Sequence, residues 1–167
     1  MRIRGVPIRV DLSWVLIAGF VVWRFAEQLS EVLADFSTPV LFASAAVGGL
    51  LFFASLLAHE LGHAFTSLDR GIRVRGILLF LLGGVTESEG EAKTARDEFV
   101  IVGIGPFISL VLAATFGLLS SATFGVQPYA AVLGYLGWFN LLLAVFNILP
   151  GYPLDGGRLL RSVLWMA

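Results

Sequence analysis

The chain has 167 residues, of which 57% are hydrophobic and 14% are charged, and its mean hydropathy is +0.89. A soluble domain carries about one quarter charged residues and cannot bury so much apolar surface in its own core. The composition therefore predicts an integral membrane protein. The net charge of -1 and the lack of a basic cluster argue against nucleic acid as the main partner, and the absence of cysteine excludes disulfides and thiolate metal sites.

Four segments are predicted to be transmembrane helices because of their length and apolar character. They cover residues 12–29, 36–66, 94–122 and 129–149. The first follows a basic flank, as a signal peptide would, but no small-residue cleavage site follows it, so we expect it to be retained. The stretch FGVQPY, residues 124–129, divides the last long uncharged run into two spans. The expected fold is an all-α polytopic membrane protein with a single domain over residues 1–167.

Residues 71–90, between the second and third spans, are predicted to form a small membrane-associated β-hairpin. Their apolar centre is too short to cross the bilayer, and its β-branched residues and Gly-Gly pair favour strands over a helix. Non-helical backbone at membrane depth persists only where it is buried in protein or lines a wet cavity. A re-entrant hairpin would therefore adjoin a functional site, and an interfacial hairpin without a role is the alternative.

Basic residues near the span ends predict how the chain crosses the membrane. They precede the first span, occupy the loop between the second and third, and follow the fourth: Arg2, Arg4, Arg9, Arg70, Arg73, Arg75, Lys93, Arg96, Arg158 and Arg161. All of them fall on one side if the chain crosses four times. Because cytoplasmic loops are enriched in lysine and arginine, we expect a multi-pass plasma-membrane protein with a cytoplasmic N-terminus.

The cytoplasmic end of the second span carries HELGH, residues 59–63, which has the pattern H-E-x-x-H. Residues four apart on a helix share a face, so His59 and His63 can bind one metal ion while Glu60 reaches a metal-bound water. Two neutral imidazoles suit zinc, beside which a carboxylate can act as general base. A surface pattern without function is the alternative, but ionisable groups beside an uncharged span are costly. We therefore expect one zinc ion per chain.

A catalytic zinc site takes three protein ligands, and the chain has no further histidine. Asp155, in FNILPGYPLDGGR, is the first ionisable residue after the uncharged run, and the predicted orientation puts it on the same membrane side as the histidines. Its alternative role is to cap a helix that begins at Gly156. Asn140 and Asn147 lie seven residues apart on the fourth span, where their amides can bond to another helix or donate to an oxyanion.

The combination of HELGH in an apolar span with NILPGYPLDGG at the end of a later one resembles the site-2 protease family of intramembrane zinc metalloproteases. The family pattern N-x-x-P-x-x-x-x-D-G matches Asn147, Pro150, Asp155 and Gly156 without a gap. GVPIRVDLSW near the N-terminus and GGV at residues 83–85 are also similar to members of this family, in particular to a branch that often carries C-terminal CBS domains. The resemblance covers nearly the whole chain.

The resemblance implies that His59, His63 and Asp155 are zinc ligands and that Glu60 is the catalytic acid and base. It also implies a transmembrane protein substrate that is cut within or near the bilayer. In bacteria such substrates include anti-sigma factors, sigma-factor precursors and remnant signal peptides, and the cleavage belongs to regulated intramembrane proteolysis.

The same resemblance implies that residues 71–90 are the hairpin of this family, which would bind the substrate as an added strand along Gly83, Gly84 and Val85. Family members usually continue into further helices or CBS domains, so we expect a truncated or minimal member. Two alternatives are an inactive relative serving as a membrane binding or chaperone module, and a zinc transporter. The intact Glu60 disfavours the first, and the absence of ionisable residues in the outer half of spans two to four disfavours the second. A homo-oligomer is compatible with the sequence.

Overall fold

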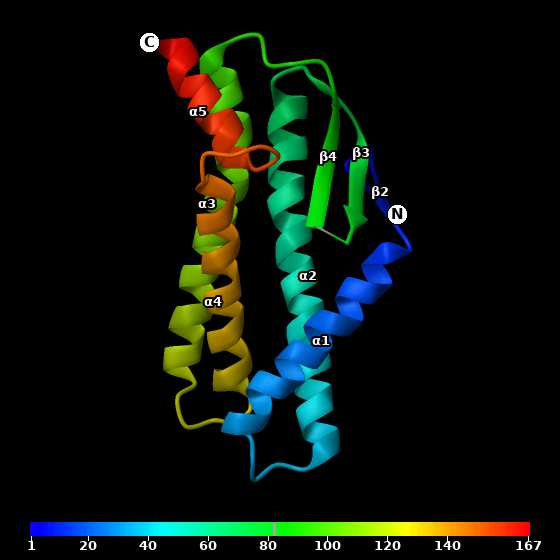
Figure 1. Cartoon of the computed structure of the whole chain (residues 1–167), viewed down its shortest axis with the longest axis vertical. Coiled ribbons are helices and arrows are strands. Elements are labelled where there is room, and N and C mark those ends of the chain that lie inside the picture. The colour runs from blue at the N-terminus through cyan, green and yellow to red at the C-terminus, as the bar shows by residue number, and fades with distance from the viewer. Residues whose placement is uncertain (82) are drawn as a thin grey trace.

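The computed structural model describes residues 1–81 and 83–167, which form five helices and four strands (Figure 1). The helices are α1 (Ser13–Val32), α2 (Thr38–Asp69), α3 (Ala95–Ala122), α4 (Tyr129–Ile148) and α5 (Asp155–Met166). The strands are β1 (Arg2–Ile3), β2 (Val6–Val10), β3 (Arg73–Phe80) and β4 (Gly83–Glu89). The long helix α2 packs against α1, α3, α4 and the sheet, so it joins the other long helices to the strands.

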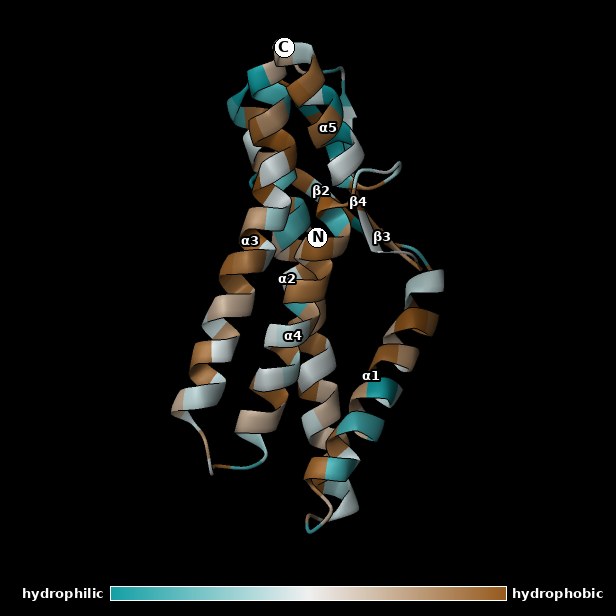
Figure 2. Cartoon of the chain, turned by 60° about the vertical axis from the view of Figure 1, so that its left-hand side comes forward, coloured by the Kyte–Doolittle hydropathy of each residue, from teal (hydrophilic) through white to brown (hydrophobic). Residues whose placement is uncertain are grey.

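Among the described residues, α2, α3 and α4 are long and apolar enough to cross a membrane. They correspond to the second, third and fourth predicted spans, and apolar residues run along most of their length (Figure 2). The first predicted span forms helix α1, which contains Arg24, Glu27 and Glu31 and does not reach the same apolarity. The predicted helical membrane protein is therefore confirmed in its main elements.

The sheet is larger than the predicted hairpin. Strands β3 and β4 form that hairpin, but the N-terminal residues, predicted only as a basic flank, add β1 and β2 in the order β1-β2-β3-β4. Strand β2 runs parallel to β3, with Ile8 opposite Ile77. This pairing buries Val6 and Ile77 against Ala64 of α2, and the burial of apolar surface stabilises it. The all-α description with an isolated hairpin is corrected to a helical protein with a four-stranded sheet.

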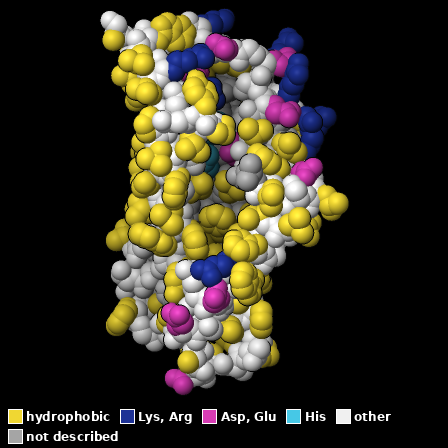
Figure 3. Space-filling model, in the orientation of Figure 1, with side chains coloured by type: hydrophobic (Ala, Val, Ile, Leu, Met, Phe, Trp, Pro, Cys, Tyr) yellow, Lys and Arg dark blue, Asp and Glu magenta, His cyan; other side chains and the backbone are white. Residues whose placement is uncertain are grey.

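Most basic side chains lie at one end of the molecule. Every lysine and arginine except Arg24 belongs to the sheet, to α5, or to the adjoining ends and loops of α2 and α3, and Figure 3 shows this clustering around the upper part of one face. The acidic residues Glu31 and Asp35 lie at the opposite end, where α1 leads into α2 (Figure 1). The charge separation agrees with the one-sided pattern of the sequence.

Candidate metal centre

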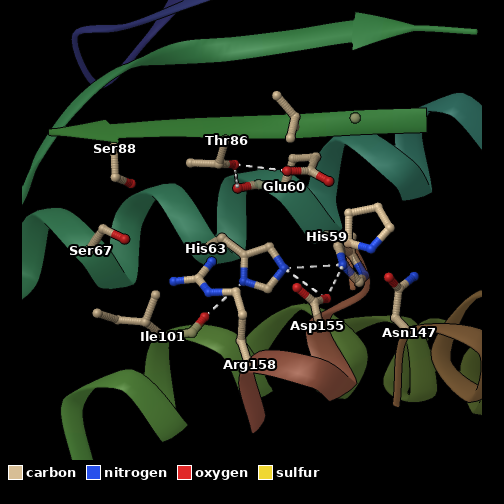
Figure 4. Close-up of a pocket in the computed structure, with 13 residues that line it drawn as sticks. His59, Glu60, His63, Ser67, Thr86, Ser88, Ile101, Asn147, Asp155 and Arg158 are labelled. Atoms are coloured by element: carbon tan, nitrogen blue, oxygen red, sulfur yellow. Dashed lines mark hydrogen bonds and ion pairs between the residues drawn. The ribbon is translucent and has the colours of Figure 1, made fainter. Parts of the chain in front are cut away.

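Three side chains from distant parts of the chain converge at the predicted metal site (Figure 4). His59 and His63 lie one turn apart on α2, and Asp155 is the first residue of α5. Asp155 Oδ2 is 3.1 Å from His59 Nε2 and 3.2 Å from His63 Nε2, and the two Nε2 atoms are 3.1 Å apart. Ligand atoms on a tetrahedral zinc ion are separated by about 3.3–3.5 Å, given bonds of about 2.0–2.2 Å. The three donors therefore fit a zinc ion that has one position open.

The turn between α4 and α5 brings Asp155 to the histidines. Helix α4 ends at Ile148, ahead of two prolines that cannot continue it. A Cβ at Gly156 would collide with the carbonyl oxygens of Ile148 and Leu149, so the tight return requires glycine. The helix-capping alternative for Asp155 does not describe the structure, because the cap residue is Leu154 and the Asp155 carboxylate faces the imidazoles.

Helix α3 supports both histidines through residues spaced four apart. The carbonyl oxygen of Ile101 accepts from His63 Nδ1 at 2.7 Å, which leaves Nε2 of the neutral ring free for a metal. Ser109 Oγ, fully buried, lies 2.9 Å from His59 Nδ1. Between them a Cβ at Gly105 would lie 2.6 Å from His59 Nε2 and would also contact the His63 ring. The sequence analysis did not predict that this face of α3 supports the histidines. The four-residue spacing of Ile101, Gly105 and Ser109 was the only feature of the sequence that could have indicated it.

Strand β4 holds the glutamate of the motif. The Thr86 hydroxyl donates to Glu60 Oε2 at 2.8 Å and also lies 3.1 Å from the Glu60 carbonyl oxygen. A Cβ at Gly84 would lie 2.5 Å from Glu60 Cγ, so the glycine makes room for this side chain. Gly84 and Thr86 are two residues apart on a strand and therefore face the same side. Thr86 was not predicted, because a lone threonine in a strand carries no functional signal.

An ion pair between a buried glutamate and a partly exposed arginine joins α5 to α3 close to the metal donors. Glu98, only 2% exposed, accepts from Arg158 Nε at 3.1 Å and from Nη2 at 3.3 Å. Arg158 lies one turn after Asp155 on the same helix. Because a buried carboxylate is costly without such a partner, the pair fixes the start of α5 against α3. It thereby stabilises the position of Asp155.

A polar cavity of about 120 Å³ adjoins the metal donors and is large enough for several water molecules. Of the residues predicted for substrate binding or oxyanion contact, Gly84, Val85 and Asn147 line it, and Gly83 lines a neighbouring cavity. Asn140 lines neither of these cavities. Its amide, fully buried between α4 and α2, donates to Ser55 Oγ at 3.3 Å and to the carbonyl of its own helix. These contacts agree with the first of the two roles open to Asn140, bonding to another helix, and its part in catalysis stays a prediction.

Comparison with known proteins agrees with this geometry. Residues 47–131 and 121–167 match the model of peptidase family M50. The chain belongs to this family, the site-2 proteases. Rip3 of Mycobacterium tuberculosis is 42% identical over 167 residues, which cover 98% of this chain and 42% of Rip3. The zinc metalloprotease MJ0392 of Methanocaldococcus jannaschii is 31% identical over 165 residues, which cover 98% of this chain and 44% of MJ0392.

The structure of this M50 family member is also similar to a solved one. The site-2 protease from Methanocaldococcus jannaschii superposes with a TM-score of 0.71 at 29% identity, covering 98% of this chain and 69% of that chain. The predicted family resemblance is thereby confirmed. The M50 chain spans about two fifths of the length of Rip3 and MJ0392.

Proposed function

We propose that this chain is the catalytic core of an intramembrane zinc metalloprotease, which hydrolyses a peptide bond in or near the transmembrane segment of a membrane protein. The observation that carries the proposal is the convergence of His59, His63 and Asp155 at zinc-ligand spacing beside the buried carboxylate of Glu60. Held by these three residues, zinc would supply Lewis acidity and lower the pKa of a water molecule. A role limited to binding does not account for a carboxylate held at this position.

Glu60 is the proposed general base and acid. Its carboxylate lines the polar cavity next to the metal donors, within reach of a water molecule there. Thr86 binds Oε2, so Oε1 is available to take the proton from the attacking water. Returning that proton to the nitrogen of the cleaved bond completes the hydrolysis.

Asn147 is the proposed oxyanion donor. It lines the polar cavity from the end of α4, and its amide uses one N–H to bond the Leu143 carbonyl at 2.9 Å. A side-chain amide has two N–H donors, so the second can stabilise the negative charge that develops on the substrate carbonyl.

The open edge of β4 is the proposed substrate-binding edge. Among the described residues, β4 pairs with β3 and with no other strand. Four of its residues line the polar cavity: Gly84, Val85, Thr86 and Ser88. An extended substrate segment can pair with this edge and gain backbone hydrogen bonds that a loosened transmembrane helix has lost. Such pairing carries the scissile bond past Glu60.

We further propose that the four helices α1 to α4 all cross the plasma membrane, with the metal centre at the cytoplasmic side. The gathering of basic residues around the sheet and α5 supports this orientation. The corresponding role is regulated intramembrane proteolysis of substrates such as an anti-sigma factor, a sigma-factor precursor or a remnant signal peptide.

Replacement of Glu60 by glutamine tests the function. The wild-type protein in detergent micelles is expected to bind one zinc ion and to cleave transmembrane peptides labelled with a fluorophore and a quencher. Glu60→Gln should retain the zinc, measured by mass spectrometry of the metal, and lose cleavage by about 10²–10⁴-fold. Glu31→Gln, on the exposed part of α1, is the matched control and should cleave normally. Wild-type protein without zinc, or Glu60→Gln with full activity, would refute the proposal.

A further inference from the structure

A second cavity, of about 300 Å³, lies beside the polar one. Apolar side chains from α1, α2 and β3 form most of its wall, including Ile17, Phe20, Phe52, Phe53, Leu56 and Phe80. His59, Glu60, Gly84 and Asn147 line both cavities, so the apolar space is continuous with the metal site. Figure 3 shows the hollow that leads from one face of the molecule to this region.

The size of the cavity suits one large apolar side chain. A protein cavity of about 150 Å³ lined by Leu, Ile and Phe holds a benzene molecule. The space beside the metal centre has about twice that volume, enough for the side chain of Phe, Leu, Met or Trp. Phe53 and Leu56, both almost fully buried, line the cavity from the same helix that carries the histidines.

The position of the cavity along β4 relates it to the cleaved bond. The polar cavity follows β4 from Gly84 to Ser88, whereas the apolar cavity lies at the turn end of the hairpin, against Gly83 and Phe80. A peptide paired with β4 advances about 3.3 Å per residue. The peptide therefore passes from one cavity to the other within about two residues. Gly83 and Gly84, at the start of β4, have no side chains that would obstruct it.

We propose that the apolar cavity is a specificity pocket that receives a bulky apolar side chain of the substrate within about two residues of the cleaved bond; the proposal rests on the proteolytic function above. A lipid acyl chain is the competing occupant. It would place hydrocarbon against the polar end of the cavity, at His59, Glu60 and Asn147. A peptide satisfies both ends, because its backbone meets the polar groups while its side chain fills the apolar space.

Photo-crosslinking tests occupancy without requiring cleavage. Glu60→Gln protein in nanodiscs is mixed with transmembrane peptides that carry a diazirine analogue of leucine at successive positions, and the labelled residues are identified by mass spectrometry. We expect one or two peptide positions to label Phe53 or Leu56. Labelling only outside the cavity would overturn the proposal. Labelling of Phe53 or Leu56 by a photoactivatable acyl chain that peptide does not displace would also overturn it.

Cleavage by the active protein tests specificity. Cut sites in the labelled peptides are mapped, and the residues around each cut are varied among Ala, Leu, Phe and Trp. The wild type is expected to prefer a bulky residue at one position by about tenfold or more. Ile17→Trp, which fills the cavity from α1, should abolish that preference, and Ile17→Ala should shift it towards Trp. Val15→Trp, on the exposed face of α1, is the matched control and should change nothing.

The crosslinking and cleavage experiments together distinguish failure of the proposed pocket from failure of the proposed protease. Crosslinks in the cavity without any cleavage by the wild type would retain the pocket and refute the protease. Cleavage with no preference near the cut, or with a preference that Ile17→Trp leaves intact, would retain the protease and refute the pocket.

Discussion

Replacing Ser109 by alanine should weaken zinc binding while leaving the fold intact. The Ser109 hydroxyl is fully buried on α3 and lies 2.9 Å from Nδ1 of His59. This contact holds the ring with Nε2 directed at Asp155, and a hydroxyl that accepts from Nδ1 leaves Nε2 free to bind a metal. Alanine removes one oxygen atom and no backbone contact, so the lost interaction is confined to the orientation of a metal ligand.

The expected magnitude follows from the role of such contacts in metal sites. Loss of an outer hydrogen bond to a histidine ligand typically lowers metal affinity by about 10–100-fold, which corresponds to about 1.4–2.7 kcal/mol. A buried nitrogen left without a partner costs about 1–3 kcal/mol, which is of the same order. The Ile101 carbonyl still orients His63, so we expect weakened binding and not its complete loss.

Zinc affinity is measured by competition with a chromophoric chelator in detergent, and circular dichroism verifies that the helices are retained. Ser121→Ala is the matched control, because this serine is also on α3 but bonds only to the Gly117 carbonyl of its own helix, on an exposed surface. A zinc affinity of Ser109→Ala within about twofold of the control would refute the assigned role of α3.

Two further substitutions test the contacts around the site. Gly105→Ala introduces a Cβ between the two imidazoles and should reduce zinc below about one tenth of an ion per chain, although alanine favours the helix. Gly117→Ala, also on α3, is the control because a Cβ there would meet no atom within 4 Å. Full zinc content in both variants would contradict the reasoning. Thr86→Val removes the hydrogen bond to the Glu60 carboxylate and should lower kcat by about tenfold or more, with KM and zinc content unchanged. Thr86→Ser, which keeps the hydroxyl, should restore most of kcat, and equal rates for the two variants would argue against positioning by Thr86.

Features that depend on local composition were predictable from the sequence. Helices α2, α3 and α4 were found because long uncharged stretches in a bilayer leave the backbone no alternative to helix. The spacing of His59 and His63 placed both on one helical face without reference to the rest of the fold. Asp155 could be proposed as their partner because ionisable residues are so scarce in the second half of the chain.

Features that depend on contacts between distant segments were not predictable. Strand β2 looks like a basic flank until it pairs with β3, almost seventy residues later in the chain. Gly105, Ser109 and Thr86 carry no chemical signature of their own, and they acquire roles only because α3 and β4 pack on opposite sides of the HELGH turn.

The sequence by itself determined the class of protein and predicted the metal ligands. Spacing along one helix pointed to His59 and His63, and the scarcity of ionisable residues pointed to Asp155. Tertiary structure decided which groups orient the ligands, that Asn140 bonds to another helix, and that an apolar cavity opens beside Glu60. Those outcomes depend on the distance between helices and on the register of strands, which arise only when the segments pack together.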